Sequence, residues 1–117
     1  MICYQLWIDD IRKPPEEGYT WIKDINEALR FIRWNKTNIY LIDIDHDAGD
    51  YRRGGTEDYI VILKELQRLA HMNSTEGMAW RVLLRDQIQF RLHSANPVGV
   101  QNMRNIIQNN GWKEIMW

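Results

Sequence analysis

Short apolar segments alternate with longer amphipathic segments along this chain, and the pattern predicts an α/β fold. Five apolar segments rich in β-branched and aromatic residues are candidate strands: residues 2–8, 19–23, 39–42, 88–92 and 112–117. Three segments with apolar residues at helical spacing are candidate helices: residues 25–34, 57–70 and 97–110. Because strands alternate with helices, we expect a mostly parallel sheet of about five strands.

Polar residues that commonly cap helices precede each predicted helix. Asp24 stands before the first helix, with Glu27 in the position that closes a capping box. Thr56 stands before the second helix, and Asn96 with the following proline begins the third. Residues 71–88 have the least regular pattern, and they predict either a short helix around residues 78–84 or an ordered excursion.

Composition and charge restrict the class of protein. The 117 residues are 44% hydrophobic and 26% charged, which indicates one folded domain over residues 1–117 with a single core. The 15 basic and 16 acidic residues give a net charge of −1, whereas domains that bind duplex DNA carry a basic surplus. There is no basic leader, no apolar run long enough to span a bilayer and only one cysteine, Cys3. We therefore expect a cytoplasmic protein with no membrane partner and no duplex DNA partner.

Polar clusters follow three of the predicted strands. They are Asp9-Asp10, the run from Asp43 through Asp45, His46 and Asp47, and His93-Ser94. Each cluster alone is compatible with a simple turn, but parallel strands bring their carboxyl ends to one edge, where ligands bind in such sheets. The crowded carboxylates need a cation or a proton to offset their repulsion, and Asp43, inside its strand, needs a partner.

Three motifs, in this order, resemble those of the cyclic-phosphate processing receiver-like domains, which are relatives of the response-regulator receiver. They are Leu-Trp-Ile-Asp-Asp-Ile-Arg at residues 6–12 with Pro14 and Pro15, Asp-His-Asp at residues 45–47 with Gly49, and His-Ser-Ala-Asn-Pro-Val-Gly at residues 93–99 with Asn102 and Met103. The resemblance implies a flavodoxin-like, three-layer receiver fold. It also implies a role in handling cyclic phosphates of nucleotides or RNA ends.

Opening a cyclic phosphodiester needs a base, an acid and positive charge for the transition state. His46 and His93 titrate near neutrality and are expected to divide the acid and base roles, with Asp45 or Asp47 available to orient a histidine. Alternatively, Asp9, Asp10 and Asp45 hold Mg²⁺ or Mn²⁺, as the equivalent carboxylates do in receivers.

The expected phosphate ligands surround the start of the last helix. Ser94, Asn96, Gly99 and the N–H groups after Pro97 would cradle a phosphate, since helix N-termini bind anions. Arg12 is the predicted phosphate clamp, because its planar fork matches phosphate oxygens. Arg52 and Arg53 are weaker candidates for binding the phosphate. The expected partner is a small phosphorylated or cyclic nucleotide, or an RNA terminus.

Three other interpretations remain open at this stage. The same pocket would serve a binding module that captures or sequesters a nucleotide without changing it. A receiver-type regulatory domain would instead be phosphorylated on Asp43 or Asp45, although the late lysine of ordinary receivers has no clear counterpart here. An interaction protein would present exposed tryptophans, and Trp80 and Trp117 are the candidates.

Overall fold

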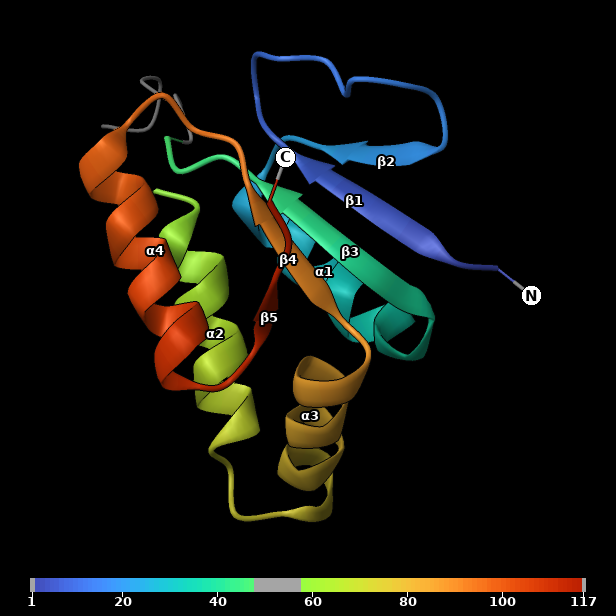
Figure 1. The fold of residues 1–117 in the computed structure, drawn as a ribbon. Coiled ribbons are helices and arrows are strands. Elements are labelled where there is room, and N and C mark those ends of the chain that lie inside the picture. The colour runs from blue at the N-terminus through green and yellow to red at the C-terminus, as the bar shows by residue number, and fades with distance from the viewer. Residues whose placement is uncertain (1, 48–57, 117) are drawn as a thin grey trace.

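The computed structural model describes residues 2–47 and 58–116, which form a five-stranded sheet and four α-helices (Figure 1). The strands are β1 Tyr4–Ile8, β2 Tyr19–Ile22, β3 Ile39–Ile44, β4 Gln89–Leu92 and β5 Lys113–Glu114. The helices are α1 Ile25–Asn35, α2 Ile60–Ala70, α3 Thr75–Asp86 and α4 Pro97–Asn109, with a 3-10 turn at Lys36–Asn38. Within the described residues, no helix is long and apolar enough to cross a membrane.

All five strands are parallel, in the order β2-β1-β3-β4-β5, which confirms the predicted sheet. The register aligns the last residues of the three central strands, since Ile8 pairs with Ile44 and Ile44 pairs with Leu92. Whatever follows these three residues therefore emerges side by side at one edge of the sheet.

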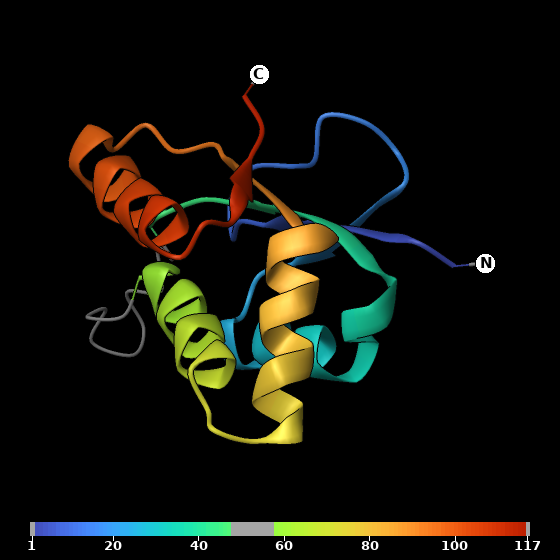
Figure 2. The ribbon, with the colours of Figure 1, turned by 60° about the horizontal axis from the view of Figure 1, so that its bottom comes forward.

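One face of the sheet supplies the hydrophobic core. Alternate strand residues, among them Leu6, Ile42 and Phe90, are fully buried in one cluster to which all four helices contribute. Figure 2 shows the ribbons of α1, α2 and α3 lying together below the sheet. The helical contributions to this cluster are Ala28 and Ile32, Leu63 and Leu66, Trp80 and Leu84, and Met103 and Ile107. Burial of each large side chain contributes about 2 kcal/mol.

The opposite face has a different character. Trp7 and Leu41 point to it and are buried, yet neither belongs to the main core cluster. Asp43 and Arg91 are aligned beside Trp7 across β1, β3 and β4. In the described part of the chain, the third layer of the expected arrangement is not helical. Instead the loop after β1 meets this face, where Trp7 Nε1 donates to the main-chain oxygen of Arg12 at 2.7 Å.

The capping predictions hold for α1 and α4. Asp24 Oδ2 accepts from the N–H of Glu27 at 2.9 Å, and Asn96 Oδ1 accepts from the N–H of Gly99 at 3.0 Å. The helix expected from residue 57 begins later, at Ile60, without a side-chain cap. Residue Thr56 lies outside the described residues.

The segment with the least regular pattern contains a full helix rather than a short one. The α3 helix begins at Thr75 because Ser74 caps it, accepting from the N–H of Gly77 at 3.1 Å. Trp80 lies on the inner side of α3 and is fully buried, so the prediction that it forms an exposed contact is wrong. Trp117, the other candidate, lies outside the described residues.

We predict that Gly77→Ala destabilises the fold. A Cβ at this position would overlap the main-chain carbonyl of Met72, which cannot move like a flexible side chain. Overpacking of this kind costs about 1–3 kcal/mol, which exceeds the roughly 1 kcal/mol that alanine gains in helix propensity. Urea unfolding measures the change, with the exposed Met78→Ala as the control on the same helix. Equal unfolding midpoints for Gly77→Ala and the unaltered chain would contradict the clash.

Candidate functional site

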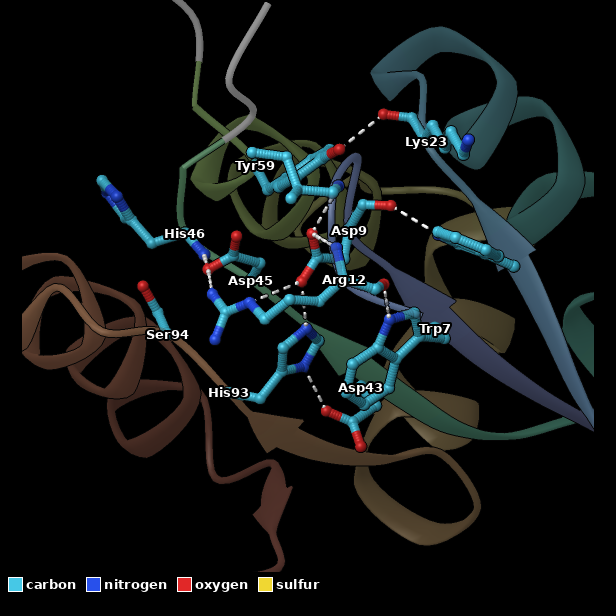
Figure 3. Close-up of polar contacts among 12 residues, drawn as sticks. Trp7, Asp9, Arg12, Lys23, Asp43, Asp45, His46, Tyr59, His93 and Ser94 are labelled. Carbon is cyan, nitrogen blue, oxygen red and sulfur yellow. Dashed lines mark hydrogen bonds and ion pairs between the residues drawn. The ribbon is translucent and has the colours of Figure 1, made fainter. Parts of the chain in front are cut away.

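The carboxyl edge of the sheet brings the predicted acidic and histidine residues together. Asp9, Asp45 and His93 follow directly after β1, β3 and β4, and main-chain hydrogen bonds continue the sheet to them. The N–H of Asp45 donates to the main-chain oxygen of Ile8 at 2.9 Å, and the N–H of His93 donates to that of Ile44 at 3.2 Å. Figure 3 shows their side chains converging around Arg12.

Asp9 is fully buried and is the most heavily bonded side chain of the edge. Its Oδ1 accepts from the N–H groups of Ile11 and Arg12 at 2.9 and 3.0 Å. Its Oδ2 lies 3.0 Å from Nε2 of His93 and 3.2 Å from Nε of Arg12. Three of these contacts are hydrogen bonds, and the fourth, with Arg12, is an ion pair.

His93 is held between two carboxylates. Its Nε2 faces Asp9, and its Nδ1 lies 2.6 Å from Oδ1 of Asp43. The ring also stacks on Trp7, with 3.7 Å between the ring centroids and an interplanar angle of 8°. Because ionised carboxylates only accept hydrogen bonds, both contacts are satisfied when both ring nitrogens carry a proton. The two carboxylates and the indole therefore hold the ring of His93 in place.

Asp43 finds the partners that a buried acid inside a strand requires. It is fully buried, and its Oδ2 lies 2.7 Å from Nε of Arg91, on the neighbouring strand in register. Arg91 also donates to the hydroxyl of Tyr19, whose pKa is raised by burial, with Arg91 opposing the shift. Sequence reasoning missed Arg91 and Tyr19. Side chains two positions apart in a strand point to the same face, so the sequence could have placed Arg91 on the face of His93.

Arg12 reaches the carboxylates from the loop after β1. Its Nη2 lies 3.2 Å from Oδ1 of Asp45, while its Nε contacts Asp9. Two indoles hold this loop in place, since Trp7 donates to the carbonyl of Arg12 and Trp21 donates to the carbonyl of Asp9 at 2.6 Å. The guanidinium therefore bridges two strand ends, and the Arg12 side chain is 49% exposed.

His46 lies in different surroundings from His93. Its Nδ1 is 2.8 Å from Oδ1 of Asp47, and its Nε2 is 3.8 Å from Oδ2 of Asp58. The hydrogen bond with His46 is the main cause that lowers the pKa of Asp47. The ring packs so closely on Gly99 that a Cβ there would overlap it. Figure 3 shows the His46 ring pointing away from Asp9 and His93, so the two imidazoles do not face one another.

The backbone of His46 is anchored on both sides. Its N–H donates to Oδ1 of Asp45 at 2.8 Å, and its carbonyl accepts from the N–H of Tyr59 at 2.9 Å. Burial raises the pKa of the Tyr59 phenol, which donates to the carbonyl of Lys23. These contacts fix the backbone position of His46 and therefore the place from which its ring extends.

The predicted phosphate ligands form the turn into α4. Ser94 Oγ accepts from the N–H of Asn96 at 3.1 Å, and Asn96 donates to Asp47 at 3.3 Å besides capping the helix. Gly99 provides the space for the His46 ring. Arg52 and Arg53 lie outside the described residues.

Among the described residues, two groups of side chains have ligand atoms close enough for a metal ion, within 4.8 Å of one another: Asp9, Asp10 and Asp45, and His46, Asp47 and Asp58. The oxygen ligands of the first group suit Mg²⁺ or Mn²⁺ chemically. However, Arg12 bridges Asp9 to Asp45 through two ion pairs, so a cation of the chain itself already lies beside two of the three carboxylates.

The comparisons with known proteins agree with the motifs of this edge. The model of the family described as "Cyclic-phosphate processing Receiver domain" matches residues 4–109, which include all three motifs. No curated protein and no solved structure shows a significant match to the chain.

We predict that Asp43→Asn lowers stability strongly. The substitution keeps the size of the side chain but leaves Arg91 and His93 without their buried carboxylate, and breaking such a pair costs roughly 3 kcal/mol or more. Urea unfolding measures the loss. The matched control is Asp86→Asn, whose exposed pair with Arg85 is expected to contribute nothing measurable. An equally small change for both variants would show that the buried contacts of Asp43 are not needed.

We predict that Asp47 titrates below the ordinary range of aspartate, because its hydrogen bond with His46 lowers the pKa. Because the pKa of Asp47 is lower in the folded state than in the unfolded state, its ionised form stabilises the fold at pH values above the unfolded pKa. This contribution is lost as the pH falls through the lowered pKa. Carboxyl ¹³C NMR titration tests the value. In His46→Ala the pKa of Asp47 should rise toward the ordinary value, and an unchanged pKa would exclude His46 as the cause.

Proposed function

We propose, from the premise that the chain belongs to the cyclic-phosphate processing receiver domains, that it binds a small cyclic phosphate at the carboxyl edge of the sheet and opens it by hydrolysis. The single observation that carries this proposal is the arrangement around the start of α4. The His46 ring packs on Gly99 in the first turn of the helix, Ser94 and Asn96 form the turn that leads into it, and Arg12 bridges the neighbouring strand ends.

Arg12 supplies positive charge for the phosphate. A guanidinium carries five N–H donors, and those that face Asp9 and Asp45 leave others for phosphate oxygens. The N-terminus of α4 adds its partial positive charge and its first-turn N–H groups. Together they would stabilise the charge that builds up on the phosphorus oxygens as the ring opens.

His46 is the proposed proton-transfer group. Asp47 holds its Nδ1, so Nε2 can take a proton from a water that attacks phosphorus. The bond from phosphorus to one ring oxygen breaks, and His46 returns the proton to that oxygen. The product is a phosphomonoester with a free hydroxyl. In this scheme His93 is a positioning residue that holds Asp9, in place of the shared acid and base roles that the sequence suggested.

The surroundings of Asp43 argue against a phosphorylated receiver as the function. Its two oxygens contact His93 and Arg91, and it has no exposed surface for a phosphodonor. Asp45 is nearly as buried and is paired with Arg12. The binding module uses the same pocket and differs only in the absence of turnover. A cyclic nucleotide or an RNA terminus with a cyclic phosphate is the proposed partner.

We predict turnover of 2′,3′-cyclic or 3′,5′-cyclic nucleotides by the purified chain, followed as the appearance of the phosphomonoester. His46→Ala should lower kcat by about 10²–10⁴-fold, the usual contribution of a general acid or base. The control is His71→Ala, because His71 is exposed at the end of α2 and contacts Asn110 instead of this edge.

Two outcomes would revise the proposal. Binding of a cyclic nucleotide without product would favour the binding module. Full turnover in His46→Ala would remove His46 from the chemistry.

A further inference from the structure

One cation serves two carboxylates of the acidic group at the sheet edge. Arg12 lies 3.2 Å from Asp9 through Nε and 3.2 Å from Asp45 through Nη2. Both carboxylates are buried, whereas about half of the Arg12 side chain is exposed. Arg12 therefore covers the group from the solvent side.

Acidic and basic side chains alternate through this region. Each member contacts the next in the series Arg91, Asp43, His93, Asp9, Arg12 and Asp45. Every carboxylate of the series thus faces a cation that belongs to the chain itself. Removing one partner from a buried ion pair is strongly destabilising, so these cations are part of the folded structure and not only of its chemistry.

Both oxygens of Asp9 already have partners. Oδ1 accepts from two main-chain N–H groups, and Oδ2 faces His93 and the guanidinium of Arg12, whereas a Mg²⁺ ion would need one of these oxygens at about 2.1 Å. An ion must therefore compete with one of these partners. The side chain of His93 is only 7% exposed, whereas that of Arg12 is 49% exposed, so Arg12 is the donor that can swing into solvent.

We propose that Arg12 is the resident cation of the group formed by Asp9, Asp10 and Asp45, and that it excludes divalent ions from this group. The inference deepens the proposed function, because it makes the phosphate chemistry of this edge independent of a divalent ion. It rests on the position of the proposed site and not on turnover. The receiver-type carboxylates are thereby neutralised by a side chain from the loop after β1.

Mn²⁺ binding to the full chain, measured by electron paramagnetic resonance, tests the proposal directly. Arg12→Gln removes the charge and leaves the carboxylates without their shared cation. We expect Arg12→Gln to bind Mn²⁺ at least about tenfold more tightly than the unaltered chain, a difference of about 1.4 kcal/mol. The control is Arg85→Gln, an exposed arginine paired with Asp86, which should bind Mn²⁺ like the unaltered chain.

A second measurement keeps the test valid if Arg12→Gln is less stable than the unaltered chain. An ion that binds only the folded state raises the melting temperature, so Mn²⁺ should raise the Tm of Arg12→Gln and leave that of Arg85→Gln unchanged. Arg12→Lys keeps one charge without the planar fork that bridges two carboxylates, and it should bind Mn²⁺ with intermediate affinity. Equal Mn²⁺ affinity in the unaltered chain and both Arg12 variants would overturn the proposal. None of these readouts uses a substrate, so a failure of turnover leaves this test intact.

Discussion

The structure depends on the carboxylate of Asp9, which is buried at the end of β1. A buried charge is tolerated only when hydrogen bonds and opposite charges compensate for the lost water. Two donors come from the adjoining loop, and a third comes from His93, 84 positions further along the chain. Satisfying one carboxylate therefore ties the loop after β1 to β4 and sets the position of Arg12.

The same edge gives its two histidines different surroundings. His93 lies between Asp9 and Asp43 and against the ring of Trp7, so its position is held. His46 contacts the half-exposed Asp47, and its ring packs on the start of α4. Both residues come shortly after a strand, and only the tertiary structure places one ring between two buried carboxylates and the other against the half-exposed Asp47.

The two faces of the sheet divide stability from chemistry. The face covered by the helices buries aliphatic and aromatic side chains in one cluster, and it can supply most of the hydrophobic stabilisation. The other face aligns Trp7, Asp43 and Arg91 in register, and the charged series of the edge continues from them. A small domain can keep several buried charged groups in this way, because each of them has a partner of opposite charge outside the apolar core.

The sequence by itself determined the order of the strands and of three of the four helices, the parallel sheet, the caps Asp24 and Asn96, and the meeting of Asp9, Asp45 and His93 at one edge. These depend on local periodicity, on cap chemistry and on the fact that parallel strands end together. Only the tertiary structure decided that Arg91 pairs with Asp43, that Arg12 turns inward to two carboxylates, and that Gly99 makes room for His46. Strand register and loop path decide which side chains touch, and neither leaves a periodic pattern in the chain.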